Sequence, residues 1–181
     1  FRYMFYCFKI NCHVVIKYVG KLSLKYKIYN MITIEDFKIK HLNKVRFIGL
    51  DLGSKRIGVS ICDERQSIAT PFKTLNKTNT NQLIEELKKI IEENNIGGII
   101  IGNPLNMDGS LGRSAQSVND VASSISQNIA LPVILWDERL STVGAFNLSS
   151  ILDVNVSKRV KTIDQNAAAF ILQGAIDFLN N

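Results

Sequence analysis

Cysteine and histidine are scarce in this chain of 181 residues, which has three of the first and two of the second. Cys7, Cys12 and Cys62 follow no spacing typical of a metal site, and Cys7 and Cys12 either pair or stay free. Cys62 falls in an apolar stretch and is expected to be a reduced core residue. His13 and His41 precede the segment expected to fold. These absences argue against a secreted disulfide scaffold, a cysteine metal site and histidine-based catalysis.

Long apolar runs are missing from the first thirty residues. The longest one there, Met4 to Phe8, is far shorter than the roughly 20 residues that cross a bilayer. It is also shorter than the apolar core of about 7–15 residues in a signal peptide. We therefore expect a cytoplasmic protein that does not contact membranes. With 46% apolar residues, the chain is long and apolar enough for one domain with its own core.

Acidic residues are also missing from residues 1–30, which carry six Lys or Arg and all five tyrosines. This segment accounts for the net charge of +6, because residues 31–181 hold 16 basic and 16 acidic residues. Any attraction to nucleic acid in the remainder must therefore come from local patches. We expect residues 1–44 to be an N-terminal extension, with 31–44 a short polar lead-in, ahead of one domain at 45–181.

The most informative segment is an expected hairpin of strands at residues 45–52 and 57–62. Side chains alternate along a strand, so Phe47, Gly49 and Asp51 share one face. Asp51 is unusual because an acid inside an apolar strand is costly unless a partner neutralises it. A metal ion is one such partner. The turn at residues 53–56 contributes the positive charges of Lys55 and Arg56.

The rest of the domain alternates between helical and strand patterns. Residues 67–75 suit a third strand at the edge of a sheet, because Pro71 is tolerated there. Strands are further expected at 97–102 and 132–136, helices at 82–94, 113–129, 142–152 and 164–179, and loops at 103–112 and 154–163. Three leading antiparallel strands followed by alternating helices and strands predict an α/β fold, a mixed sheet flanked by helices.

Four acids fall where such sheets collect functional groups. Asp51 lies near the end of the first strand, and Asp137 and Glu138 follow the last strand. Asp164 is at the start of the last expected helix. Neighbours in an extended chain point to opposite sides, so one of Asp137 and Glu138 is expected to join Asp51 while the other holds Arg139 or caps a helix. Mg²⁺ or Mn²⁺ prefers such oxygen ligands. Alternatively, Asp164 is an N-cap and Asp137 an ordinary helix-entry residue.

Basic residues gather in or near the same loops. As a group they could contact a phosphate backbone, whereas each one alone would be an ordinary solvated surface charge. They are Lys55, Arg56, Arg113, Arg139, Lys158, Arg159 and Lys161. The loop at 102–112 has the glycines and amides to approach a phosphate closely. The same composition also suits a purely structural loop.

Four segments, in this order, resemble the YqgF (RuvX) family of bacterial Holliday junction resolvases or pre-16S rRNA nucleases. They are residues 49–60 (Gly-Leu-Asp-Leu-Gly-Ser-Lys-Arg-Ile-Gly-Val-Ser), 101–110 (Ile-Gly-Asn-Pro-Leu-Asn-Met-Asp-Gly-Ser), 137–142 (Asp-Glu-Arg-Leu-Ser-Thr) and 161–168 (Lys-Thr-Ile-Asp-Gln-Asn-Ala-Ala). The resemblance covers about residues 45–180. Residues 1–30 have no counterpart in it.

The resemblance implies an RNase H-like fold and a nuclease that uses one or two Mg²⁺ or Mn²⁺ ions. It makes Asp51 the carboxylate of the first strand, Asp164 that of the last helix, and Glu138, or else Asp137, the third catalytic and metal-binding acid. Asn103 stands where many RNase H-like nucleases have an acid. The implied substrate is the 5′ end of pre-16S rRNA or a Holliday junction.

Two other functions remain open. One is a non-catalytic nucleic-acid or ribosome-associated binding module with the same fold. The other is an actin-like phosphotransferase or ATPase, which has a similar first hairpin but needs two such domains. A homodimer would match the symmetry of a four-way junction, although no segment of the sequence indicates one.

We expect Met31 to be the natural start of the protein, because residues 1–30 differ in composition from all that follows. The alternative is a basic, aromatic arm that contacts nucleic acid or a membrane surface. N-terminal sequencing of the native protein tests this. A mature protein that begins before Met31 would favour the arm.

Overall fold

The computed structural model describes residues 31–39, 45–77, 79–140 and 156–181; for Ile39, Leu140 and residues 156–164 it describes the backbone alone. The helix expected at residues 142–152 therefore lies outside the described residues. Within the described part of the chain, no helix is long and apolar enough to span a bilayer.

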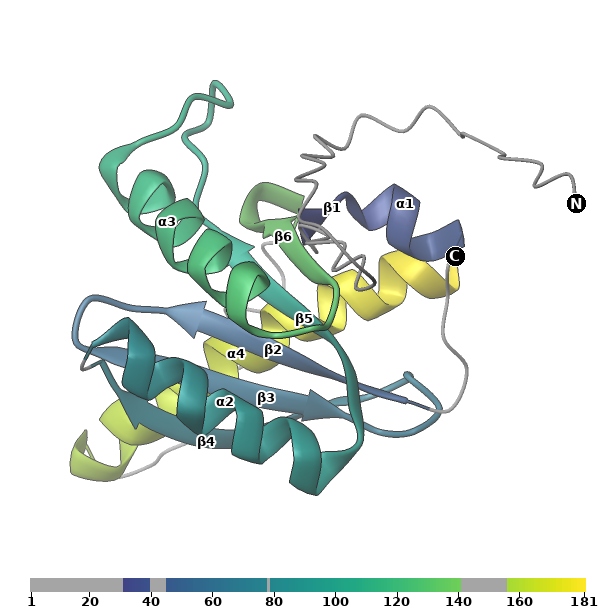
Figure 1. Ribbon diagram of the computed structural model, residues 1–181. Helices are drawn as coiled ribbons and strands as arrows, with labels where there is room; N and C mark the ends of the chain where they lie inside the picture. Colours follow the sequence, from purple (N-terminus) through teal and green to yellow (C-terminus); the bar gives the residue numbers. More distant parts are fainter. Residues whose placement is uncertain (1–30, 40–44, 78, 141–155) are drawn as a thin grey trace, which may run out of the picture.

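A six-stranded mixed sheet forms the centre of the fold, with the strand order β1-β6-β5-β2-β3-β4 (Figure 1). Strand β2 pairs with β3 and β3 with β4 in antiparallel fashion, while β2, β5, β6 and β1 run parallel. The strands are β1 (Met31–Ile32), β2 (Arg46–Leu52), β3 (Arg56–Cys62), β4 (Ala69–Asn76), β5 (Ile96–Asn103) and β6 (Val133–Asp137). The expected mixed sheet with three leading antiparallel strands is confirmed. The order and directions of its five strands β4-β3-β2-β5-β6 are those of the RNase H-like fold, and β1 is added beside β6.

Helices cover both faces of this sheet. They are α1 (Ile34–Ile39), α2 (Thr80–Asn94), α3 (Arg113–Asn128), the short 3-10 helix η1 (Glu138–Leu140) and α4 (Val156–Asn180). Helices α2 and α3 pack on one face, and α1 and α4 pack on the other. The layers follow from strand alternation, because successive side chains of each central strand enter opposite cores.

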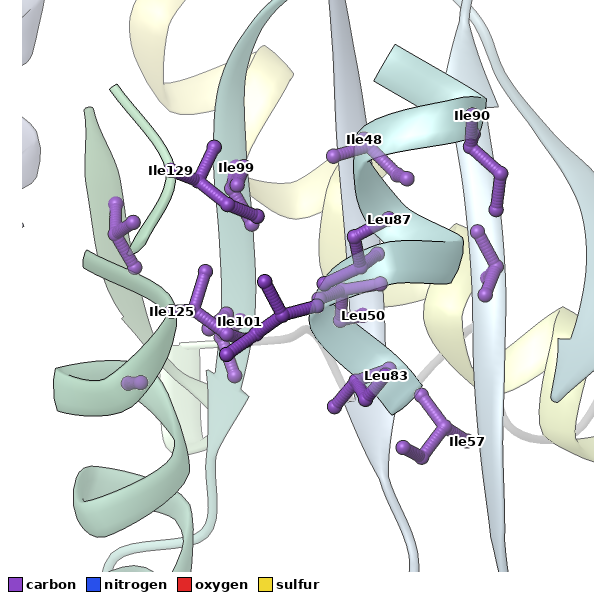
Figure 2. Packing of buried hydrophobic residues seen from close by; sticks show 14 of the residues in the cluster. Ile48, Leu50, Ile57, Leu83, Leu87, Ile90, Ile99, Ile101, Ile125 and Ile129 are labelled. Carbon is purple, nitrogen blue, oxygen red and sulfur yellow. The ribbon is translucent and has the colours of Figure 1, made fainter. Parts of the chain in front are cut away.

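The core under α2 and α3 is built from aliphatic side chains. In Figure 2, Leu87 of α2 lies near Ile48 and Leu50, Leu83 of the same helix lies near Leu50 and Ile57, and Ile125 of α3 lies near Ile101. These residues of α2 recur at helical spacing and form the apolar face that the sequence predicts. The helix begins after Asn79 and ends at Asn94, close to the expected bounds.

On the other face, α4 lies almost in contact with the backbone of β2. A Cβ atom on Gly49 would stand 2.5 Å from Ser60 Oγ and 2.9 Å from the carbonyl oxygen of Ala168. The Ser60 hydroxyl donates a hydrogen bond of 2.8 Å to that same oxygen. Gly49 is therefore required for the close approach of helix and strand, and Ser60 holds the two together.

Helix α4 corrects two expectations from the sequence. Residues 156–163, expected to be part of a basic loop, belong to the helix, which begins at Val156. Val156, Val160 and Ile163 recur at helical spacing, so the apolar period of the last helix simply starts earlier than expected. Asp164 consequently lies in the helix interior, and its alternative interpretation as an N-cap is wrong.

The interval 31–39 also differs from the expected polar lead-in. Strand β1 pairs with β6, and α1 buries Phe37, which is 1% exposed. The Phe37 ring meets the Phe47 ring edge-on with centroids 5.2 Å apart, above Gly98. Ile34 and Phe37 are buried in the core on the α4 side, and Met31 and Ile32 pack against the two cores, contacts that only the folded chain reveals.

Phe37→Ala should lower the free energy of unfolding by about 3–5 kcal/mol, because it removes a buried aromatic ring and leaves a cavity beside Phe47. Chemical denaturation with urea measures the change. Glu35→Ala on the exposed side of the same helix is the control and should change stability by no more than about 0.5 kcal/mol. Equal stability of the two variants would show that α1 does not pack on the core.

Candidate functional site

Three parallel strands end at the same edge of the sheet, and each brings a residue of interest there. Strand β2 ends with Asp51 and Leu52, β5 with Gly102 and Asn103, and β6 with Asp137. The register pairs Leu50 with Ile101 and Asn103 with Asp137, so these ends lie side by side. Reactive groups of open α/β sheets collect at such carboxyl ends.

Glu138 and Asp51 face each other across β5. A Cβ atom on Gly102 would collide with Glu138 Oε1 and with Ile171 of α4, so the Glu138 carboxylate occupies the α4 side of the sheet above Gly102. Asp51 lies on the same side, because it is two residues beyond Gly49, which faces α4. The absence of a side chain at Gly102 makes room for the carboxylate above β5, between the ends of β2 and β6.

The electrostatics of Glu138 reflect this neighbourhood. Burial raises the pKa of the Glu138 carboxyl, and the negative charges of Asp51 and then Asp137 raise it further. Asp51 and Glu138 are both half-buried, and two neighbouring carboxylates in such surroundings repel each other. A divalent cation held by their oxygens would remove the repulsion, so the donor set present fits Mg²⁺ or Mn²⁺.

Asp137 has a different partner from Glu138. Its two carboxylate oxygens accept hydrogen bonds from Arg139 Nε at 3.0 and 3.1 Å and from Arg139 Nη2 at 2.6 Å. These bonds hold the pKa of Asp137 below its ordinary value. Of the acidic pair, the structure thus brings Glu138 beside Asp51 and gives Asp137 to Arg139, one of the arrangements that strand alternation left open.

Asp164 lies on the turn of α4 that approaches this edge. It is four residues before Ala168, whose carbonyl oxygen meets Ser60 next to Gly49. Toward its other end, α4 reaches Ala69, whose N–H donates to Gln173 Oε1, so the helix runs away from the edge that carries Asp51. The side chain of Asp164 is outside the described part, and among the described residues no group of three or more metal-binding side chains gathers. The contact between Asp164 and Asp51 remains a prediction.

Asn103 ends β5 at this edge, where related folds often have an acid. It is 8% exposed, and its Oδ1 atom has no hydrogen-bond partner among the described residues. By strand alternation it points to the α2–α3 side, opposite to the Glu138 carboxylate above Gly102. Sequence analysis noted Asn103 only as a departure from the usual acid, whereas the structure gives it a free acceptor.

The basic residues expected to bind nucleic acid are only partly gathered. Lys55 and Arg56 lie at the β2–β3 turn near Asp51, and Arg113 is exposed at the start of α3. Lys77 joins the turn, since its N–H donates to the Lys55 carbonyl at 2.9 Å and its Nζ to Gly53 at 3.3 Å. Sequence analysis missed Lys77, although its position directly after an antiparallel third strand could have placed it there.

The remaining basic candidates are placed differently. Arg139 is bound by Asp137, so its charge is already neutralised. Lys158, Arg159 and Lys161 belong to α4, and their side chains lie outside the described part. The described positive charge at the edge therefore comes mainly from the β2–β3 turn.

Comparison with known proteins gives a consistent result. A family model described as "RuvX: Holliday junction resolvase" matches residues 45–178. A Pelagibacter ubique (strain HTCC1062) protein named "Putative pre-16S rRNA nuclease" is 91% identical over 151 residues, which cover 83% of this chain and all of that protein. A Rhodobacter capsulatus protein of the same name is 43% identical over 131 residues, covering 72% and 82% of the two chains.

One solved structure with some likeness is Thermus thermophilus RuvC in complex with a Holliday junction substrate. The two chains are 11% identical, the match covers 73% of this chain and 93% of that one, and the TM-score is 0.49.

Asp51→Asn is expected to lower the pKa of the Glu138 carboxyl in metal-free protein, because it removes a neighbouring negative charge. The wild-type pKa is raised, so the folded state binds this proton more tightly than the unfolded chain does. The contribution of Glu138 to stability is therefore present at low pH and is lost as the pH rises through the raised pKa.

NMR titration of the side-chain carboxyl carbons in the presence of EDTA measures this pKa. Asp120→Asn, at an exposed position of α3, is the control and should leave the Glu138 titration unchanged. An ordinary pKa for Glu138 in the wild type would show that the two carboxylates are not neighbours.

Proposed function

The chain belongs to the RuvX family of Holliday junction resolvases, and we propose that it is a metal-dependent nuclease that hydrolyses phosphodiester bonds in structured nucleic acid. The family model matches residues 45–178, which contain both of the carboxylates at the edge of the sheet. The observation that carries the proposal is the placement of Asp51 beside Glu138 above Gly102, because a divalent cation between the two carboxylates would remove their repulsion.

Asp51 and Glu138, with Asp164 from α4, are the proposed metal ligands. Mg²⁺ or Mn²⁺ held by these residues would supply charge neutralisation for a phosphodiester and a more acidic water molecule as nucleophile. The protein orients its donors for this task by rigid elements: Asp51 is fixed by the sheet, Glu138 follows the end of β6, and Asp164 is carried by the helix that Ser60 ties to β2.

Residues around the two acids have separate proposed roles. Lys55, Arg56, Lys77 and Arg113 attract the phosphate backbone and position it at the edge of the sheet, independently of base sequence. Asp137 does not bind metal in this proposal, because Arg139 occupies both of its oxygens. It instead fixes the segment that follows β6, and thereby the direction in which Glu138 points.

The proposed substrate is a precursor RNA or a branched nucleic acid. The two curated relatives described above are named for pre-16S rRNA, whereas the family model is named for Holliday junctions. We propose maturation of the 5′ end of pre-16S rRNA as one role and junction cleavage as the other. Both substrates are found in the bacterial cytoplasm, which is therefore the proposed location.

Asp51→Asn, Glu138→Gln and Asp164→Asn should each reduce the rate of cleavage by about 100-fold or more, the effect of losing roughly 2.7 kcal/mol of transition-state stabilisation. Asp137→Asn should cost less, because it disturbs position and not metal binding. Cleavage of precursor rRNA and of a four-way junction is measured with increasing Mg²⁺ or Mn²⁺. The same ions should raise the melting temperature of the wild type and not of Asp51→Asn.

Asp177→Asn is the matched control for Asp164→Asn, since Asp177 is an exposed carboxylate near the far end of the same helix. It should cleave like the wild type. If the wild type cuts neither substrate while a known nuclease does, and Asp51→Asn binds both as well as the wild type does, the chain is a non-catalytic binding module.

A further inference from the structure

The loop between β5 and α3, residues 104–112, exposes two large apolar side chains beside the candidate site. Met107 is 91% exposed and Leu111 is 60% exposed. The loop leaves the carboxyl end of β5 and projects beyond the start of α3, away from the body of the fold (Figure 1). Neither side chain contributes to a core in the described residues, so stability does not explain their apolar character.

This loop is held in one shape by its own hydrogen bonds. The Asn106 N–H donates to the Ser110 carbonyl at 3.1 Å, and the Gly109 N–H donates to the Asn106 carbonyl at 2.8 Å. Asp108 Oδ1 accepts from the N–H of Ser110 at 2.9 Å. Gly109 has a φ of +83°, a conformation that glycine adopts without strain. The apolar tip is therefore presented by an ordered turn.

Arg139 fastens the same loop to the candidate site. Its Nη1 atom donates to the carbonyl oxygens of Asn106 and Met107, both at 3.3 Å. Asp137 holds the other side of the guanidinium group through Nε and Nη2. Because Arg139 directly follows Glu138, the carbonyl of Met107 is connected to the acidic site by one side chain. The tip has a fixed position relative to Glu138.

We propose that Met107 and Leu111 form an apolar wedge that contacts an unpaired or unstacked base beside the phosphodiester bound at Asp51 and Glu138. This inference rests on the proposed function and specifies its substrate class. Base faces are the apolar surface of a nucleic acid, and a continuous duplex hides them by stacking. Apolar side chains enter where stacking is interrupted, and a thioether contacts aromatic rings favourably.

In this proposal Arg139 is a positioning residue. Its guanidinium group is already engaged by Asp137 on one side and by two loop carbonyls on the other. It holds the wedge in place and contributes little to phosphate binding. The preferred substrate is consequently a branch point, a loop or a single-strand junction over a continuous duplex.

The test uses the full chain with Asp51→Asn, which is expected to slow cleavage strongly, and a four-way junction carrying 2-aminopurine at the branch point. Binding of this parent should increase 2-aminopurine emission, because insertion of the wedge unstacks the base. Adding Met107→Ala and Leu111→Ala should abolish the increase and weaken junction binding by about two- to tenfold, the range of a sulfur–aromatic contact. Binding to a continuous duplex should not change.

Ile68→Ala is the matched control, because Ile68 is an exposed apolar residue on the connection between β3 and β4, at the opposite edge of the sheet from Asp51. It should leave emission and affinity unchanged. Met107→Leu should retain most of the increase in emission. Melting temperatures of all variants verify folding, and the exposed position of Met107 means that they should match the parent.

Arg139→Lys separates positioning from phosphate binding. Lysine keeps the charge but cannot bridge Asp137 and two carbonyls with a planar fork. The variant should lose the 2-aminopurine increase while the salt dependence of binding stays that of the parent. A slope reduced by about one unit in Arg139→Gln would instead identify Arg139 as a phosphate contact.

The outcomes distinguish this inference from the proposed function. If the parent gives no increase in emission, or if the doubly substituted wedge variant matches the parent in emission and junction affinity, the wedge is wrong even when the wild type cleaves. Such a result would favour a protein contact for the exposed tip. If the wedge effects appear and the wild type never cleaves, the inference holds for a binding module and the nuclease proposal fails.

Discussion

Direct contact between helix α4 and strand β2 is the constraint on which the rest of the site depends. Gly49 has no side chain to separate the two elements, and Ser60 bonds to the helix backbone at Ala168. An alanine at Gly49 would meet Ser60, Leu172 and the Ala168 carbonyl within 2.9 Å. This contact sets the height of α4 above the sheet, and so determines how far Asp164 stands from Asp51 in the folded chain.

A second glycine makes the acidic site possible on that same face. Gly102 leaves the space that the Glu138 carboxylate occupies, between the end of β2 and the end of β6. The cost is electrostatic, since Glu138 is half-buried and faces Asp51 with Asp137 nearby. Folds tolerate such repulsion where a bound cation compensates for it. The repulsion between the carboxylates and the presence of their donor oxygens thus both favour binding of a divalent cation.

The segment after β6 distributes two neighbouring acids between two tasks. Glu138 turns toward Asp51, while Asp137 turns toward Arg139 and, through it, toward the loop at 104–112. Asp137, Arg139 and the exposed apolar loop are therefore parts of one hydrogen-bonded unit that directly adjoins Glu138 in the chain. A displacement of the loop would therefore be transmitted through Arg139 and Asp137 to the segment that carries Glu138.

The sequence by itself determined the mixed sheet, the antiparallel start and the strand ends that carry Asp51 and the pair Asp137 and Glu138, because period-two strands and glycine-bounded apolar runs depend on local spacing. It placed Asp164 at the start of its helix, since the weaker apolar period of residues 156–163 did not override their basic character. It also treated residues 31–39 as a lead-in. Only the tertiary structure decided that Phe37 enters the core, that Glu138 and not Asp137 approaches Asp51, and that Arg139 binds the loop. These are contacts between residues far apart in the chain or choices between adjacent side chains, and both depend on how the elements pack.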